Sequence, residues 1–304
     1  PAIDDSDEPF PYKTIVWAGI IGFIVMMAIA VQAGMWLWVA GVYFIIILLF
    51  AVTYARLRAE AGSPMVWLFP IMKQWEMMYH IGGSAVLQRG TGWGNLTIFS
   101  MFYWLSRGFF PTMAGYQIES SRIAQEGRIN QKTMVYWLIA ALLIGLLGAY
   151  VMHLQAYYSY GANVLEGGTT EGGSRVQAAA ASWKLVSAWV GAHSAPDRPR
   201  LIAGVVGFLF TTMLVVLRSM FLRFPLHPLG FVMITSYGGP VWGPFFIVWV
   251  IKSIVLRVGG MKLYRQLIPF FLGLILGHFF MAGVVWGSIS LYNEMYNRYG
   301  VWFG

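Results

Sequence analysis

The ionisable side chains that stand closest together in an apolar stretch of the sequence are Lys73, Glu76 and His80. In a helix that turns by about 100° per residue, these three side chains lie within an arc of about 60° and share one face. Charged groups at membrane depth are costly and often line an ion or proton pathway, and a histidine beside a glutamate can relay protons. The alternative is a short surface helix with its charges in headgroup water. Two possible ligands, Glu76 and His80, are too weak a signal to predict a metal site.

A second candidate feature is the break in the apolar segment 230–256. Residues 238–244 contain three glycines and two prolines, which end an ordinary helix. In lipid such a break is tolerated only where protein or a water-filled cavity satisfies the freed backbone groups, and transporters build substrate or ion sites from it. A connecting loop between two short helices is the alternative. The candidate pathway residues at this break are Tyr237, Gly238, Gly239 and Pro240.

The remaining polar residues give weaker signals. Glu119 and Arg122 could form a helical ion pair, although a solvated pair of this kind contributes little. His153 and His278 stand singly in or near apolar runs, where hydrogen bonds to neighbouring helices are expected. Lys252 is expected to extend its ammonium group toward the membrane surface.

Motifs of the common enzyme classes are missing from the 304 residues. There is no glycine-rich phosphate loop followed by Lys-Ser or Lys-Thr, no Gly-x-Ser-x-Gly and no His-Glu-x-x-His. There is also no cysteine, which excludes disulfides, thiolate metal sites and cysteine catalysis within this sequence. We therefore expect no enzymatic activity and no cofactor.

Composition places the chain in a lipid bilayer. It is 58% hydrophobic and 11% charged, whereas about a quarter of the residues of a soluble domain are charged. The net charge of +8 comes from basic residues in short turns between apolar runs. That pattern is the orientation signal of a membrane protein and not the basic surface of a nucleic-acid-binding protein.

The elements predicted to position these residues are all helical. An acidic, proline-containing linker at residues 1–13 precedes a transmembrane domain at residues 14–304. About five full spans are expected, together with two re-entrant or broken helical hairpins. The spans are predicted at residues 14–31, 36–54, 135–153, 201–216 and 267–289.

The two hairpins are predicted because basic segments flank both of their ends. The first, residues 64–115, contains a helix at 71–81 that is about 17 Å long, stops at Gly82 and Gly83, and is too short to span. The second, residues 230–256, has its tip at residues 238–244 and arms of about eight and twelve residues, each shorter than a span.

Residues 157–200 form the one long hydrophilic insert and are expected outside the cytoplasm. Within it, residues 174–190 have the pattern of an amphipathic helix. We expect this helix on the outer surface of the bundle or membrane, with a lid over a cavity as the alternative. Its predicted apolar face consists of Val176, Ala180, Trp183, Val186 and Val190.

Three segments of the chain resemble a known family. Residues 56–62, 111–126 and 237–277 are similar, in the same order, to uncharacterised bacterial membrane proteins related to the oligopeptide transporter superfamily. The resemblance implies a polytopic transporter fold in the bacterial inner membrane. Members of that family are longer, so this chain would correspond to their C-terminal half.

Two functions are compatible with these observations. One is half of a secondary transporter, proton-coupled by the residues above, for a small peptide-like or metal-chelate solute. The other is a non-transporting structural or accessory subunit of a larger membrane complex, which the scarcity of charge and the 17% aromatic content favour. An aqueous cavity lined by Glu76, His80 and the tip at residues 238–244 would favour transport.

A stripe of small residues on the last span predicts helix packing. Gly273, Gly277, Gly283 and Gly287 fall within about 120° on a uniform helix, which lets another backbone approach closely. The partner is expected to be a membrane helix from a missing N-terminal half or a second subunit, with a helix of this chain as the alternative.

The positions of the basic residues also predict orientation. Residues 167–200 should lie outside the cell and the basic turn at residues 257–265 in the cytoplasm. Cysteines introduced at Gly172 and Gly260 should therefore react with a membrane-impermeant thiol reagent from opposite sides. Labelling of both cysteines from the same side would contradict this topology.

Overall fold

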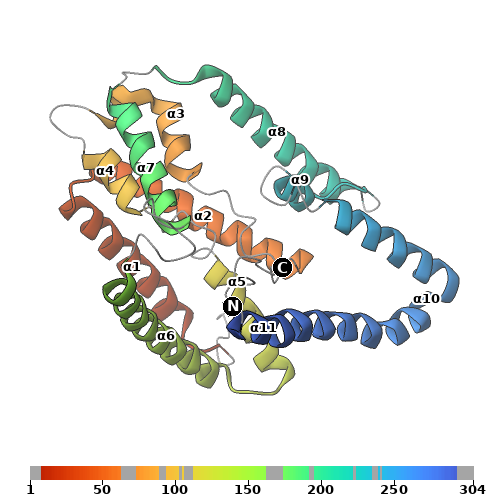
Figure 1. Cartoon of the computed structure of the whole chain (residues 1–304). Coiled ribbons are helices and arrows are strands. Elements are labelled where there is room, and N and C mark those ends of the chain that lie inside the picture. Colours follow the sequence, from red (N-terminus) through yellow and green to blue (C-terminus); the bar gives the residue numbers. More distant parts are fainter. Residues whose placement is uncertain are drawn as a thin grey trace. The chain divides into compact units, whose positions relative to one another are not determined.

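A computed structural model describes residues 8–62, 73–88, 94–102, 105, 112–161, 174–191, 195–221, 224–234, 239 and 242–292. These residues are almost entirely helical and include no strand, which confirms the all-α prediction (Figure 1). The chain divides into two compact units, Pro1–Val232 and Met233–Gly304, which are described separately.

Five helical segments in the described residues are long and apolar enough to cross a membrane, so the chain is a multi-pass membrane protein. Four of them coincide with predicted spans and are extended at their ends mainly by polar residues, whereas the fifth also includes the apolar residues 242–256 of the predicted second hairpin. The segments are α1 (Tyr12–Gln32), α2 (Leu37–Ala61), α6 (Gln131–Tyr160), α8 (Arg198–Met220) and Trp242–Ile289.

The core of the first unit lies where three shorter helices meet α1 and α2. These are α3 (Lys73–Leu87), α4 (Gly94–Met101) and α7 (Ser174–Gly191), which gather beside α2 (Figure 1). Their large apolar side chains are excluded from solvent, so this cluster holds the unit together. Its largest fully buried members are Trp75, Tyr43, Phe99, Met35 and Leu87.

A buried asparagine joins the ends of four helices in this unit. Asn95 is fully buried, and its Oδ1 accepts a hydrogen bond from the Trp36 N–H, 2.8 Å away, at the turn between α1 and α2. Its Nδ2 donates to the Leu87 carbonyl oxygen at 3.1 Å, at the end of α3. The preceding Gly94 lies so close to the Gly34 carbonyl that a side chain would collide with it. Both the oxygen and the nitrogen of the Asn95 side-chain amide are therefore used to hold α3 and α4 against the turn.

The predicted break in the first hairpin is present, but the helix does not stop there. Gly83 has φ +70° and ψ −179°, a positive-φ conformation that glycine adopts readily. Beyond Gly83, α3 resumes and continues to Leu87. Residues 63–72 and 89–93 lie outside the described part, so the turns of this hairpin stay a prediction.

Helix α7 packs into the core, and its predicted apolar face is wrong at two of five positions. Its buried positions are Ser182, Val186 and Trp189, whereas Trp183 is 45% exposed and Ala180 is also exposed. Ser182 shares a 2.8 Å hydrogen bond with the buried Ser100 of α4. Tertiary contact with α3 and α4 thus selects a face that apolar periodicity alone does not identify.

Helix α5 (Thr112–Glu126) packs against the C-terminal part of α2, and α5 in turn contacts α6. Helix α6 begins at the cap residue Asn130, whose side chain accepts the Lys132 N–H at 2.9 Å. None of the residues of α6 is buried. An apolar helix without a buried residue is compatible with a lipid environment and not with water.

The second unit contains the long helix α10 (Trp242–Phe279), which α9 (Pro228–Ile234) precedes in sequence. Helix α10 bends sharply at Gly260, with φ +58° and ψ −157°, so that two arms run back from one vertex (Figure 1). A side chain at Gly259 would collide with Leu263. The predicted turn at residues 257–265 is therefore reduced to a bend at two glycines. Because positive φ strains other residues, Met261 is a better position than Gly260 for the cysteine label.

The second predicted hairpin differs from the observed structure in its arm lengths. The arm at residues 242–259 is about 27 Å long, close to a full span and not the short arm expected. Gly243 and Pro244 lie in its first turn, where proline's missing N–H is not needed. Gly239 is described, whereas Tyr237, Gly238 and Pro240 lie outside the described residues.

Beyond α10 the helix changes its winding before it ends. Phe280–Trp286 is a π-helical segment (η4), followed by α11 (Gly287–Tyr292). The two pairs Gly273/Gly277 and Gly283/Gly287 are thus separated by a stretch whose rotation per residue differs from an α-helix. A side chain added at Gly273, Gly277 or Gly287 would meet no other atom of this unit within 4 Å. Packing of this stripe against other membrane helices stays a prediction.

The role of Asn95 can be measured by removing its amide. Asn95→Ala leaves the Trp36 N–H and the Leu87 carbonyl without their partner, and should lower the free energy of unfolding by about 2–4 kcal/mol. Thermal unfolding in mild detergent measures the loss. The matched control is Gln117→Ala on the exposed face of α5. Equal effects of the two substitutions would contradict the structural role of Asn95.

Candidate functional site

The face of α3 that carries Glu76 and His80 borders a groove between α2, α3 and α8. The groove has a volume of about 750 Å³ and is open to the surroundings on one side. Glu76 and His80 therefore share one face, as their spacing predicts, while Lys73 begins α3 and its side chain lies outside the described part. The groove is lined by Phe50, Glu76, Met77, His80, Ile81, Arg200, Leu201, Gly204, Val205 and Phe208.

His80 lies between a cation and a carboxylate at one end of this groove. Arg200 Nη1 is within hydrogen-bond distance of His80 Nε2, and Asp197 Oδ2 lies 3.8 Å from His80 Nδ1. Because a guanidinium group can only donate, Nε2 must be the acceptor in this arrangement. The ring proton of the neutral histidine is therefore assigned to Nδ1, which lies 3.8 Å from Asp197 Oδ2 and 3.4 Å from Arg200 Nη1.

The position of Arg200 and Asp197 follows from the start of α8. Asp197 caps the helix, since its Oδ1 accepts the Arg200 N–H at 3.1 Å, and its Oδ2 lies 3.3 Å from Arg200 Nε. The Asp197 N–H donates to the His80 carbonyl oxygen at 2.9 Å. The start of α8 is thus attached to α3 through the backbone as well as through side chains.

Sequence reasoning missed Asp197 and Arg200 because it began the fourth span at Leu201. A signal was present, since Asp-Arg-Pro-Arg has an N-cap aspartate and a proline in the first turn. What local sequence could not indicate is that this helix start lies against residue 80. Within the described residues, no three His, Asp or Glu side chains come together as metal ligands.

Behind the groove, aromatic stacking holds α3 against α7. The rings of Tyr79 and Trp189 are stacked with centroids 3.7 Å apart and planes inclined by 5°. Trp75 meets Trp189 edge-on at 5.2 Å, and Gln88 Nε2 donates to the Trp189 carbonyl oxygen at 2.8 Å. The helix that carries Glu76 and His80 is therefore well packed on the adjacent face, and the His80 ring also meets the Trp189 ring edge-on, with centroids 6.4 Å apart.

A second charged site joins α2 to α5. Arg58 Nε lies 2.7 Å from Glu119 Oε1, and Arg58 Nη2 donates to Glu119 Oε2 at 2.9 Å. The guanidinium carbon also lies 4.5 Å from the centroid of the Tyr116 ring. Gly115 permits this approach, because a side chain there would be 2.8 Å from Arg58 Cδ.

The predicted pair between Glu119 and Arg122 is wrong. Glu119 faces Arg58, whose side chain is only 12% exposed, and Arg122 pairs with Glu126 at 2.9 Å. A two-point contact with a partly buried guanidinium is stronger than a solvated contact three residues along a helix.

The other singled-out polar residues do not line the groove. His153 Nδ1 is 2.7 Å from the Ala149 carbonyl oxygen of its own helix, and the expected hydrogen bond to a neighbouring helix stays a prediction. In the second unit, the ammonium group of Lys252 lies 5.2 Å from the Tyr264 ring centroid. His278 is an exposed residue of α10.

A double-mutant cycle measures the contribution of the Arg58–Glu119 contact. Arg58→Met and Glu119→Gln should show a coupling of about 1–2 kcal/mol in unfolding experiments, since Arg58 is partly desolvated. The exposed pair Arg122–Glu126 is the matched control and should show about 0.5 kcal/mol or less. Equal coupling in the two cycles would contradict the assignment of Arg58–Glu119 as the stronger pair.

Comparison with known proteins identifies a family but no activity. The model of a family of unknown function, DUF6785, matches residues 1–303. No curated protein and no solved structure matches the chain. Because the match covers nearly the whole sequence, the chain belongs to the DUF6785 family.

Proposed function

We propose that the protein is half of a proton-coupled secondary transporter for a small peptide-like or metal-chelate solute. The observation that supports this best is the groove between α2, α3 and α8, which combines an apolar wall with titratable side chains at one end. Such grooves are the usual form of small-molecule sites, with few polar groups among many apolar ones.

The extent of the groove suits a solute pathway. Arg200 lies in the first turn of α8, and Phe208 lies about 12 Å farther along that helix. Phe50, which lines the same groove, is near the middle of α2. If α2 and α8 cross the bilayer, the groove leads from the membrane surface toward the midplane, where secondary transporters hold their substrates.

The arrangement around His80 provides a means of coupling to protons. Protonation of His80 at Nε2 would remove the lone pair that accepts from Arg200, and would place two cations side by side. Arg200 would then separate from His80 and become available to an anionic group in the groove. Glu76, on the same face of α3, is the second candidate proton carrier.

The substrate class comes from the family resemblance together with this chemistry. Peptides and many metal chelates carry carboxylates, which a guanidinium group binds with two parallel hydrogen bonds. The groove residues Phe50, Leu201 and Phe208 would contact apolar parts of the solute. Further membrane helices, from an N-terminal half or a second subunit, would complete the pathway.

A non-transporting accessory subunit is the second candidate function. The uncovered surface of α6 favours it, because a helix without buried residues is suited to contact partner helices as well as lipid. The two candidate functions differ in whether Glu76 and His80 carry protons or only keep the groove hydrated.

Transport can be tested in right-side-out vesicles from cells that make the protein, so that natural partners are present. The vesicles hold a pH-sensitive dye and are given trialanine or iron(III) citrate under an inward proton gradient. We expect solute-dependent acidification of the lumen, which Glu76→Gln should reduce to the level of vesicles without the protein.

The control is Glu126→Gln, which changes an exposed carboxylate of α5 and should leave acidification unchanged. Unchanged acidification in the Glu76 variant would remove this residue from the pathway. If vesicles with the protein acidify no more than vesicles without it, for both solutes, the accessory role is favoured.

A further inference from the structure

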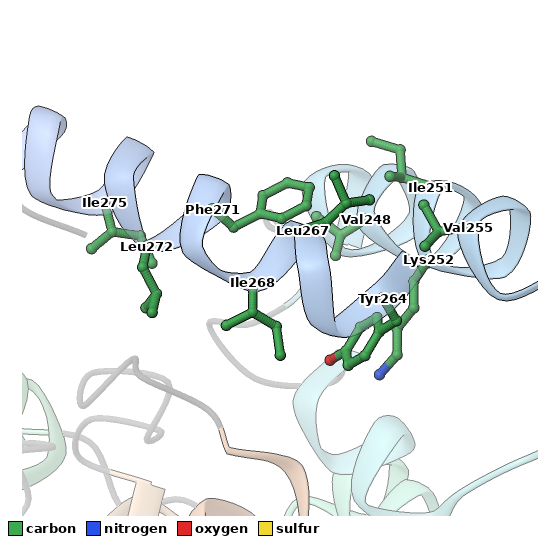
Figure 2. A pocket seen from close by; sticks show the side chains of 10 residues that line it. All are labelled: Val248, Ile251, Lys252, Val255, Tyr264, Leu267, Ile268, Phe271, Leu272 and Ile275. Carbon is green, nitrogen blue, oxygen red and sulfur yellow. The ribbon is translucent and has the colours of Figure 1, made fainter. Parts of the chain in front are cut away.

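The bend in α10 creates an apolar crevice between its two arms. The crevice has a volume of about 370 Å³, and Figure 2 shows side chains of both arms along it. It belongs wholly to the second unit and is separate from the groove that carries the proposed transport function. Its lining residues are Val248, Ile251, Lys252, Val255, Tyr264, Leu267, Ile268, Phe271, Leu272 and Ile275.

The polar groups of this crevice are confined to the end nearer the bend. Only Lys252 and Tyr264 among the lining residues have polar side chains, and Figure 2 labels both of them. Lys252 belongs to the arm before Gly260 and Tyr264 to the arm after it. Because the Lys252 ammonium group lies 5.2 Å from the Tyr264 ring centroid, the two side chains meet across the crevice. The remainder of the lining, to Ile275, is aliphatic or aromatic.

The charge around the bend is not compensated by acidic residues of this region. The sequence contains no Asp or Glu between Asp197 and Glu294. Four cationic side chains lie within or beside the bend of α10, namely Lys252, Arg257, Lys262 and Arg265. A group of cations of this kind next to a membrane helix attracts anionic lipid.

The length of the crevice corresponds to one leaflet of a bilayer. Tyr264 and Ile275 are separated by about 16 Å along the second arm. The hydrocarbon core of a bilayer is about 30 Å thick, so each leaflet contributes about 15 Å. An occupant with one polar end and an apolar tail of leaflet length therefore matches the crevice.

We propose that this crevice binds an anionic phospholipid, with one acyl chain along residues 264–275 and its phosphate at Lys252 and Tyr264. The ammonium group supplies the charge and the phenol supplies a hydrogen-bond donor. The other cations of the bend hold the headgroup by longer-range attraction. The basic bend would then lie at the headgroup level of the leaflet in which the lipid resides.

Native mass spectrometry of the full chain, purified in mild detergent, tests the proposal. The protein is offered an equimolar mixture of phosphatidylglycerol and phosphatidylcholine of the same chain length. We expect preferential retention of phosphatidylglycerol, about fivefold weaker in Lys252→Gln because one cation near a phosphate is lost. The matched control Lys132→Gln, an exposed lysine at the start of α6, should retain the wild-type preference.

Two further measurements separate the crevice from general basicity. Leu272→Trp fills the apolar end without changing charge, and should also reduce retention of phosphatidylglycerol. An excess of inorganic phosphate should not displace the lipid, because phosphate has no acyl chain. Equal retention of both lipids, unchanged retention in Leu272→Trp, or displacement by phosphate would each overturn the proposal.

Discussion

The first unit depends most on the contact between α3 and Trp189. Tyr79 stacks on the indole ring, Trp75 meets its edge, and Gln88 binds its carbonyl oxygen. These contacts bury one face of α3, which leaves the face with Glu76 and His80 toward the groove. Aromatic rings of this size contribute large buried areas and a defined geometry. The orientation of the titratable residues is therefore determined by packing on the adjacent face of the same helix.

The connection between α3 and α8 adds a second constraint. The Asp197 N–H binds the His80 carbonyl oxygen, while the Asp197 carboxylate caps α8 and faces the His80 ring. One residue thus aligns the backbone of α8 with α3 and brings Arg200 to the imidazole. A shift of α8 would change the partner of His80, and a change in the charge of His80 would alter the attachment of α8. The proposed coupling of protons to helix position rests on this shared residue.

The spans could be predicted from sequence because each depends only on a long local run of apolar residues. The same holds for the break at Gly83, since glycine acts on its own backbone. The partner of Glu119 could not be predicted, because Arg58 is 61 residues away in the chain and the alternative, Arg122, is local. The prediction for α7 missed the buried Ser182 for a related reason, since this residue is buried where it contacts Ser100 of another helix. The Arg200–His80 contact joins residues 120 apart, and no local pattern marks it.

The single-residue bend at Gly260 has a consequence for the position of the two arms in the membrane. Both arms of α10 are close to spanning length, and almost no connecting segment separates them. If both arms span, the basic vertex has to stay in the headgroup region of one leaflet, because moving its charges into hydrocarbon is costly. Neither arm can then shift along the membrane normal without moving the vertex and, with it, the other arm. The bend thus makes the depth of the two arms in the bilayer a single shared property.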